Sequence, residues 1–369
     1  MQLVQATRDA LLKPLSTVAG IVERRNTLPI LANILLRKEG KSVAFIATDL
    51  EVQISTHAEF GVGDENESTT VAARKLLDIL RALPDSGDIK LGLASAKLSV
   101  QSGKSRFALQ TLASTEFPIL AQPDKWDVSF SLPQKTLKHL FNMVHFAMAQ
   151  QDIRYYLNGL LFVFEPGFVR TVATDGHRLA HSGTVVEGIE GKHDVIVPRK
   201  TVLEMQRLLA DTDEPVSIDV AAGQIRFRFG DVELVSKLVE GKFPDFTRVI
   251  PNNYTRHFTV NREILQGSLQ RAAILTTDKL KGVRVQLSDN QLKISSSNAE
   301  QEEAQEEIDI DYSHEPLDVG FNVSYLLDVL ANVKTETIQW SVQPDVNASA
   351  LITSPEDDQF KYVVMPMRI

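Results

Sequence analysis

The feature that most constrains this chain is a five-residue segment that recurs three times at nearly constant spacing. Ala47 begins Ala-Thr-Asp-Leu-Glu, Ala173 begins Ala-Thr-Asp-Gly-His, and Ser296 begins Ser-Ser-Asn-Ala-Glu. The separations are 126 and 123 residues, a spacing typical of an internally repeated domain. Only the middle copy contains a histidine, His177. The pattern predicts three related domains, of which the second has acquired a feature that the others lack.

Other landmarks follow the same period. Apolar residues recur at helical spacing over 7–25, 134–150 and 262–281. After each stretch come two short runs typical of strands, at 34–36 and 42–46, at 160–164 and 168–172, and at 283–287 and 291–295. A second helix is predicted over 72–84, 198–211 and 322–334, and each repeat closes on a proline, at Pro118, Pro244 and Pro366. Because four kinds of landmark agree, the repeat is predicted to span the whole chain.

The expected fold class is α+β, with three tandem similar domains. We place them at residues 1–125, 126–253 and 254–369, because polar and turn-forming residues interrupt the periodic segments near 124–127 and 251–256. Each predicted domain is then about 120 residues long, a common domain size, and holds two helices and many short strands.

Composition sets the class of protein. Of the 369 residues, 43% are hydrophobic and 24% charged, as in ordinary globular proteins. The first ten residues already include Arg8 and Asp9, so we expect no signal peptide. No apolar run approaches the roughly 18 residues of a membrane span. The absence of cysteine excludes disulfides, thiolate nucleophiles and cysteine-bound zinc, and it fits the reducing cytoplasm in which we expect the protein.

Charge is unevenly distributed between the predicted helices and the rest of the chain. The formal net charge is −9, yet the six predicted helices together carry +9 and five of them are positive. All other residues therefore carry −18. If the helices share one surface, that surface is basic and suits nucleic acid. The alternative is that each helix has an ordinary solvated face of charged residues.

Three short stretches combine cations with groups that suit nucleic acid. Arg154 adjoins Tyr155 and Tyr156, so a guanidinium for phosphate lies beside rings that stack on bases. Adjacent tyrosines in a strand are more often packed against neighbouring strands, which is the alternative. The basic pairs at 24–25 and 199–200 also suit phosphates, although each pair alone is weak evidence.

Two segments in different repeats carry opposite charge. Residues 300–311 contain seven acidic residues out of twelve, whereas residues 103–109 alternate Lys104 and Arg106 with Phe107 and Leu109. Exposed strand edges pair readily, so a basic edge in the first repeat and an acidic edge in the third predict head-to-tail assembly. Two solvated strands remain the alternative.

No enzyme motif is complete in this sequence. Asp175, His177 and Ser182 lie too close together for a triad, and no Gly-x-Ser-x-Gly segment is present. Two Gly-Lys-Ser segments lack the first glycine of a phosphate-binding loop, and His-Glu-x-x-His is absent. We expect Asp175 and His177 to alternate along a strand end and to point to the same side, a common surface arrangement. A hydrolase built on this pair remains a third hypothesis.

Several motifs together resemble the bacterial DNA polymerase III beta subunit family, the sliding clamps. They are Thr-Leu-Pro-Ile-Leu from Thr27, Arg-Tyr-Tyr-Leu-Asn-Gly from Arg154, Ala-Thr-Asp-Gly-His-Arg-Leu-Ala from Ala173, and Met-Pro-Met-Arg from Met365. The resemblance spans the full chain. It implies the DNA clamp fold, with two helices and two antiparallel sheets in each domain, and a head-to-tail homodimeric ring whose helices line a hole around duplex DNA.

The same resemblance implies function and partners. The ring would tether the replicative polymerase to DNA without catalysis, cofactor or metal, and without regard to DNA sequence. One pocket between the second and third domains would receive short peptide motifs of the DNA polymerase III alpha subunit, the clamp loader delta subunit, other DNA polymerases and mismatch-repair proteins. Its apolar residues, with arginine and histidine at the rim, suit peptide binding. No membrane partner is implied.

The resemblance assigns three sets of site residues. The implied peptide pocket comprises Leu157, Thr174, Gly176, His177, Arg178, Leu179, Pro244, Arg248, Val249, Asn322, Tyr325, Val346, Val363, Val364, Met365, Pro366, Met367 and Arg368. The implied DNA contacts are Arg25, Arg74, Gln151, Tyr155, Tyr156, Arg199 and Lys200. The implied dimer contact sets Lys104, Arg106, Phe107 and Leu109 against Ile274, Leu275, Glu302, Glu303 and Glu306. Ile369 replaces a leucine of related clamps, which should reshape the pocket slightly, and Leu280 is expected near the same place.

A non-catalytic protein-binding scaffold that does not encircle DNA is the alternative function. Triplication and an apolar pocket are compatible with it. The positive charge of the helices favours the clamp, because a scaffold has no need of a basic helical surface.

Overall fold

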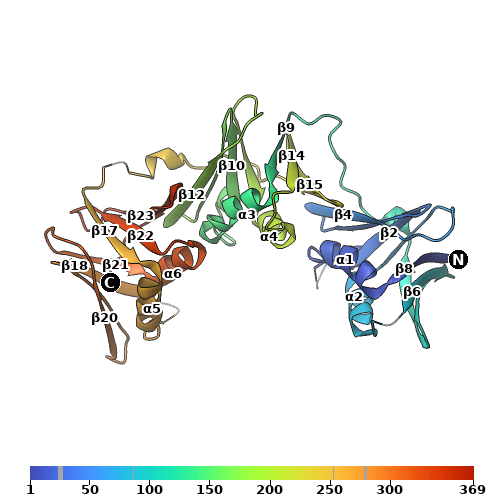
Figure 1. Cartoon of the computed structure of the whole chain (residues 1–369), viewed down its shortest axis with the longest axis horizontal. Helices are drawn as coiled ribbons and strands as arrows, with labels where there is room; N and C mark the ends of the chain where they lie inside the picture. The colour runs from blue at the N-terminus through green and yellow to red at the C-terminus, as the bar shows by residue number, and fades with distance from the viewer. Residues whose placement is uncertain (24–27, 86, 252, 278–280) are drawn as a thin grey trace. The chain divides into compact units, whose positions relative to one another are not determined.

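The computed structural model describes residues 1–23, 28–85, 87–251, 253–277 and 281–369. These residues form six α-helices and many short strands, which Figure 1 labels along the chain. Within the described ranges, no helix is long and apolar enough to cross a membrane.

The three repeats have the same order of elements. The first contains β1 (Gln2–Thr7), α1 (Arg8–Ala19), β2 (Asn33–Glu39), β3 (Ser42–Thr48), β4 (Val52–Glu59), β5 (Glu67–Ala72), α2 (Ala73–Ala82), β6 (Asp88–Ala94), β7 (Lys97–Ser102) and β8 (Ser105–Leu112). The second contains β9 (Val128–Pro133), α3 (Gln134–Asn142), β10 (Gly159–Glu165), β11 (Phe168–Thr174), β12 (Arg178–Val185), β13 (His193–Pro198), α4 (Arg199–Leu208), β14 (Pro215–Ala221), β15 (Gln224–Phe229) and β16 (Val232–Lys237). The third contains β17 (Arg256–Asn261), α5 (Arg262–Ala273), β18 (Gly282–Ser288), β19 (Gln291–Ser297), β20 (Glu303–Asp309), β21 (Leu317–Asn322), α6 (Val323–Asn332), β22 (Thr337–Val342), β23 (Ala350–Ser354) and β24 (Asp357–Val364).

Each repeat builds two four-stranded antiparallel sheets, as the resemblance implied. In the first repeat the strand orders are β1-β6-β7-β8 and β5-β2-β3-β4, and the other repeats reproduce both orders. Sheets of successive repeats join through β4 with β16 and through β12 with β24. The two sheets of the first repeat also join, through β5 with β8, so the continuous sheets have 12 and 8 strands. The chain forms two compact units, Met1–Lys135 with Arg207–Leu238, and Thr136–Gln206 with Val239–Ile369.

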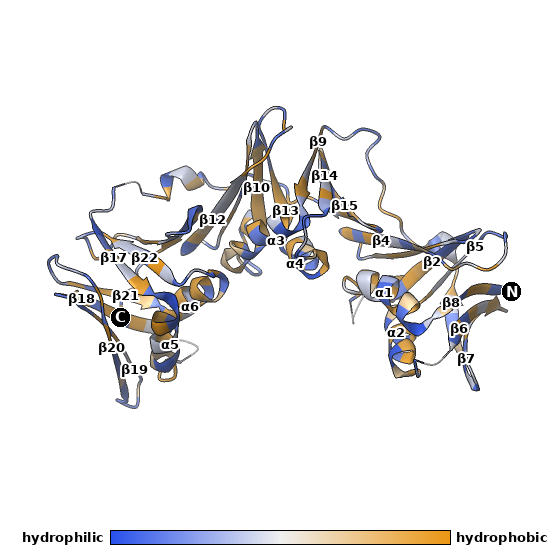
Figure 2. Ribbon diagram, viewed as in Figure 1, coloured by the Kyte–Doolittle hydropathy of each residue, from blue (hydrophilic) through white to orange (hydrophobic). Residues whose placement is uncertain are grey.

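Local sequence explains the elements. Strand β7 alternates buried and exposed residues, as a strand with one covered face must, and Figure 2 shows such alternation of apolar and polar residues. Helices α1 and α5 begin at capping side chains: Thr7 accepts the backbone N–H of Ala10, and Asn261 accepts those of Glu263 and Ile264. In the first repeat α1 packs on α2, β3 and β4, and in the third α5 packs on α6, β19 and β20.

The helices are shorter than the sequence pattern predicted. Helix α3 ends at Asn142 rather than near residue 150, and a separate 3-10 turn, η3 (His145–Ala147), follows it. Helix α5 ends at Ala273. Within the observed bounds five of the six helices are still net positive, and α6, whose one charged residue is Asp328, is negative. The basic character of the helices therefore does not depend on where the helices end.

Candidate functional site

The recurring segment forms a hydrogen-bonded turn between β11 and β12. The Thr174 hydroxyl accepts the N–H of Gly176 at 3.1 Å and donates to the Arg178 carbonyl at 2.6 Å. Asp175 Oδ1 accepts the N–H groups of His177 and Arg178 at 2.9 and 3.1 Å. Gly176 has a φ of +91°, a conformation that glycine adopts without strain. The motif is thus a structural turn that places residues 174–178 at one end of a sheet.

The first repeat contains the same turn between β3 and β4. Thr48 Oγ1 accepts the N–H of Leu50 at 3.0 Å, and Asp49 Oδ1 accepts those of Glu51 and Val52 at 2.9 and 2.7 Å. The repeat therefore extends to individual hydrogen bonds. The turns differ in their side chains, because the first repeat has Leu50 and Glu51 where the second has Gly176 and His177.

The expected alternation of Asp175 and His177 along a strand end is wrong. Both residues lie in the turn, and the Asp175 carboxylate is occupied by two backbone N–H groups and by Arg178 Nε at 3.1 Å. Asp175 therefore orders the turn. No group of three or more acidic, histidine or cysteine side chains in the described part of the chain has metal-binding geometry.

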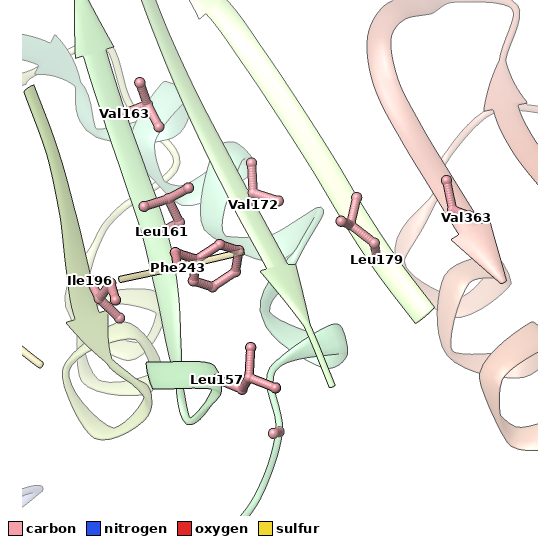
Figure 3. Packing of buried hydrophobic residues seen from close by; sticks show 9 residues of the cluster. Leu157, Leu161, Val163, Val172, Leu179, Ile196, Phe243 and Val363 are labelled. Atoms are coloured by element: carbon pink, nitrogen blue, oxygen red, sulfur yellow. The ribbon is translucent and has the colours of Figure 1, made fainter. Parts of the chain in front are cut away.

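A cavity of about 150 Å³ opens beside this turn. Its floor is a cluster of buried apolar residues, shown in Figure 3, that includes Leu157, Leu179, Phe243 and Val363. These residues come from both the second and the third repeat. The cavity is lined by Arg154, Tyr156, Leu157, Thr174, Gly176, His177, Arg178, Leu179, Phe243, Pro244, Val249, Val363 and Met365. A space of roughly this size accommodates a benzene-sized apolar group, so it suits one or two apolar side chains of a ligand.

Arg178 ties this cavity to the third repeat. Its side chain is 9% exposed, and Nη1 lies 2.5 Å from Asp328 Oδ2 on α6. Nη2 donates to the Phe146 carbonyl at 2.7 Å, and the guanidinium lies 4.3 Å from the centre of the Tyr325 ring. Burial alone would lower the pKa of Arg178, but Tyr362 and Asp328 raise it above its ordinary value. Arg178 therefore stays charged and fixes one wall of the cavity.

A second cavity, of about 640 Å³, lies along the C-terminal tail, which we define as residues 365–369. It is lined by Arg284, Asp318, Val319, Gly320, Val346, Asn347, Met365, Pro366, Met367, Arg368 and Ile369. Met365 lines both cavities. The tail is anchored at two points: Met365 N donates to the His177 carbonyl at 2.9 Å, and Met367 N to that of Gly320 at 2.8 Å. The two cavities are therefore adjacent and meet at Met365, and the rest of the tail lines the second cavity.

Most of the implied pocket residues line one cavity or the other, but their binding role stays a prediction. Four line neither cavity: Arg248, Asn322, Tyr325 and Val364. Asn322 caps α6 by accepting the N–H of Ser324, and Val364 is buried. Arg154, Tyr156 and Phe243 line the first cavity, although none was assigned to the pocket. Phe243 could have been found from the repeated Phe-Pro pair that it shares with Phe117.

The implied DNA contacts lie on helix starts and on one loop. Arg74 is an exposed residue of α2, and Arg199 and Lys200 begin α4 and are half-buried. Tyr155 and Tyr156 form a 3-10 turn, η4 (Tyr155–Leu157), rather than the strand considered above. The Tyr155 side chain is exposed, whereas Tyr156 packs on the apolar cluster and lines the cavity. Arg25 and Leu280 lie outside the described residues.

The implied dimer contacts lie on or beside the strands β8 and β20 and just after the end of α5. β20 is the edge of its sheet, and β8 pairs on its outer side only through Leu112 and Thr111 with β5. Phe107 is 38% exposed and Ile274 is 75% exposed. Glu306 already binds Arg271 of the same chain through two hydrogen bonds, of 2.9 and 2.6 Å, and these bonds lower its pKa. Lys104, Arg106, Glu302 and Glu303 are exposed.

Comparisons with known proteins identify the family. Models of the DNA polymerase III beta subunit match over their N-terminal domain at residues 1–121, their central domain at 131–245 and their C-terminal domain at 247–368. The beta sliding clamp of Pseudomonas aeruginosa is 45% identical over 363 residues, and that of Escherichia coli K12 is 44% identical over 364, with 98% of each chain covered.

Solved structures agree with the sequence comparisons. A crystal structure of the Pseudomonas aeruginosa DNA polymerase sliding clamp with ligand superposes with a TM-score of 0.95 at 44% identity, over the full length of both chains. Another from the same organism, with the same TM-score and identity, is bound to griselimycin. The chain has three tandem clamp domains and belongs to the DNA polymerase III beta subunit family, the DNA sliding clamps, which are processivity factors of replication and not enzymes.

Proposed function

We propose that two copies of this sliding clamp join head to tail through β8 of one copy and β20 of the other, and that the resulting ring encircles duplex DNA. The observation that carries this proposal is the internal repeat. Within the chain, β4 pairs with β16 and β12 pairs with β24. β4 and β12 occupy the same position in the first and second repeats, and each pairs with the last strand of the following repeat. β20 and β8 are the corresponding strands of the third and first repeats, and among the described residues neither pairs with a strand of another repeat.

The repeat also supplies a register for this contact. Val232 pairs with Thr56 and Leu234 with Ile54 in the first junction. If β8 and β20 pair as β16 and β4 do, equivalent positions of the repeats place Ser105 opposite Glu306 and Phe107 opposite Ala304 of the second copy. The same register sets Lys104 opposite Glu307 and places Arg106 between Glu303 and Glu307. Opposite charges at facing and diagonal positions stabilise antiparallel pairs, so the register and the charge pattern support each other.

Apolar residues beside these strands favour the same contact. Ile274 and Phe107 are more exposed than large apolar side chains usually are, and Leu275 is half-buried. Burying Ile274 and Leu275 would contribute up to about 1.5–3 kcal/mol each. The proposed interface therefore combines an apolar part with charged pairs.

Changing both Ile274 and Leu275 to alanine should convert the dimer to monomer. Sedimentation at micromolar concentration should give about 82 kDa for the unmodified protein, twice the 41.0 kDa of the chain, and about 41.0 kDa for the variant. Val185→Ala is the matched control, because Val185 is as exposed as Ile274 but lies on β12, away from the proposed contact. A double variant that keeps the mass of the unmodified protein would refute the interface.

The proposed DNA contacts are sequence-independent. Arg25, Arg74, Arg199 and Lys200 would pair with phosphates, and Gln151, Tyr155 and Tyr156 would form a further contact from one loop. Phosphate contacts position a protein on DNA without reading the bases, which suits a ring that must slide. The positive charge on five helices supports this role over that of a scaffold that does not encircle DNA. A replication protein of this kind acts where the chromosome lies, in the bacterial cytoplasm.

We further propose that the two adjacent cavities bind short apolar peptide segments of partner proteins. These partners would include the DNA polymerase III alpha subunit, the clamp loader delta subunit, other DNA polymerases and mismatch-repair proteins. The first cavity has an apolar floor that suits an anchoring side chain of the peptide. At its rim, backbone groups and the Arg154 guanidinium can form hydrogen bonds with polar groups of the peptide.

Deleting residues 365–369 should abolish ligand binding and leave the fold intact, because the tail lines both cavities but extends beyond the last strand, β24. Griselimycin is a suitable probe, since a related clamp has been crystallised with it. Isothermal titration calorimetry would measure binding, and circular dichroism would check the fold. Unchanged affinity in the truncated protein would place the binding site elsewhere.

A further inference from the structure

We propose, building on the ligand pocket proposed above, that Gly320 is a positioning residue: its missing side chain lets the C-terminal tail lie against β21, where the tail lines the second cavity and reaches the first through Met365. Gly320 lies within β21, where its carbonyl accepts the N–H of Met367 at 2.8 Å. The two residues also form an isolated antiparallel bridge. The tail thus extends the sheet by one residue pair, in which Met367 lies opposite Gly320.

Steric contact explains why this position is glycine. A Cβ on Gly320 would overlap the Met367 carbonyl oxygen and the Cγ1 and Cδ1 atoms of Ile369. The backbone of Gly320 does not have a positive φ, so its conformation would accept any residue. The three atoms nearest to such a Cβ therefore all belong to the tail, which makes the tail the main reason for a glycine here.

The identity of these three atoms predicts which part of the structure would move. All of them belong to the tail, and one is a backbone atom that cannot rotate away. An alanine at this position should therefore displace the tail and leave the sheet in place. Overpacking of this kind displaces the neighbouring segment. If a ligand binds only when the tail lies against β21, its affinity falls in proportion to the fraction of molecules in which the tail still lies there.

Gly282 provides a matched control. It lies on β18, adjacent to β21, and faces the same residue of the tail. A Cβ on Gly282 would lie 3.4 Å from Ile369 Cδ1 and Cγ1, which is ordinary van der Waals contact. Gly282→Ala therefore makes the same chemical change in the same sheet without displacing the tail.

The test compares the full-length protein with its Gly320→Ala and Gly282→Ala variants. Hydrogen exchange is measured by mass spectrometry without ligand, on the C-terminal peptide that contains Met365 and Met367 and on peptides from β18 and β21. Griselimycin affinity is measured by calorimetry. Gly320→Ala should speed exchange in the C-terminal peptide only and weaken griselimycin binding by roughly 5- to 100-fold, the range that overpacking costs imply. Gly282→Ala should change neither quantity.

Two results would overturn the positioning role of Gly320. One is unchanged exchange of the C-terminal peptide in Gly320→Ala, and the other is loss of protection throughout β18 and β21, because the alanine would then act on the sheet. The proposed binding function is tested separately by the unmodified protein. If the unmodified protein does not bind griselimycin, that function fails, whereas exchange at the tail still decides whether Gly320 positions it.

Discussion

Two threonines at corresponding positions, Thr48 and Thr174, show how single residues maintain the repeated turn. Each hydroxyl accepts the N–H two residues later and donates to the carbonyl four residues later. Both threonine side chains are buried, so each hydroxyl is held in place to make these two hydrogen bonds. Only Thr174 also lines a cavity. The pair therefore separates the structural role of the turn from its role at the pocket.

Replacing either threonine by valine should lower the free energy of unfolding by about 1–3 kcal/mol, because it removes two hydrogen bonds worth roughly 0.5–1.5 kcal/mol each. Denaturant unfolding measures this loss. Thr174→Val should also weaken griselimycin binding, whereas Thr48→Val should not. Equal weakening by both variants would mean that the turn affects the pocket only through overall stability.

At the residue scale the sequence predicted the segment but not its chemistry. The repeat pointed to Asp175 and His177, yet only the structure shows Asp175 accepting backbone N–H groups. Arg154 was interpreted as a phosphate ligand, whereas its guanidinium binds Asp152, holds the pKa of that carboxyl at about 2, and lines the cavity beside Gly176. Such contacts depend on how loops fold, and spacing in the sequence does not determine them.

At the scale of elements, strands were predicted more accurately than helix ends. The paired runs of all three repeats are strands within a few residues of their expected bounds. The predicted helices were too long because apolar periodicity continues in the sequence beyond the last helical hydrogen bond. After α3, the chain turns at residues 143–144 and forms η3, whose residue Ala147 is buried. Burial there produces the same apolar signal that a longer helix would give.

The junction of β12 and β24 should be sensitive to acid. His181 on β12 is buried, its Nδ1 lies 2.9 Å from the Gln359 carbonyl oxygen, and burial lowers its pKa from the ordinary 6.5. Arg170 and Lys361 lower the pKa of His181 further, whereas Asp357 raises it. Because the folded state disfavours the protonated ring, the stabilisation is complete above pH 6.5 and is lost as the pH falls below it.

Thermal unfolding at pH 7.5 and pH 5.5 should therefore show a lower Tm at the acidic pH. In His181→Gln, whose amide can still donate to the Gln359 carbonyl, the decrease should be smaller. It should not vanish, since burial also lowers the pKa of His145. A decrease of the same size in both proteins would show that His181 does not cause it.

At the scale of the whole molecule, the period of the sequence predicted three related domains, and their proposed boundaries near residues 125 and 253 stay predictions. The matching strand order of all three repeats and the family comparisons support the triplication. Assembly is a different kind of inference, because it depends on what the edge strand β20 and the incompletely paired strand β8 meet in a second copy. Composition alone would have been misleading here, since a net charge of −9 does not suggest a DNA-binding protein. The distribution of charge among the elements was the informative quantity.

Retention on DNA of different topology tests the central claim most directly. A protein that grips DNA through phosphate contacts loses affinity steeply as salt rises, because counterions are released on binding. A closed ring is held by topology instead. After a clamp loader has placed the protein on nicked circular DNA, it should remain there through a high-salt wash and should slide off once the DNA is linearised. Equal retention on circular and linear DNA would contradict encirclement.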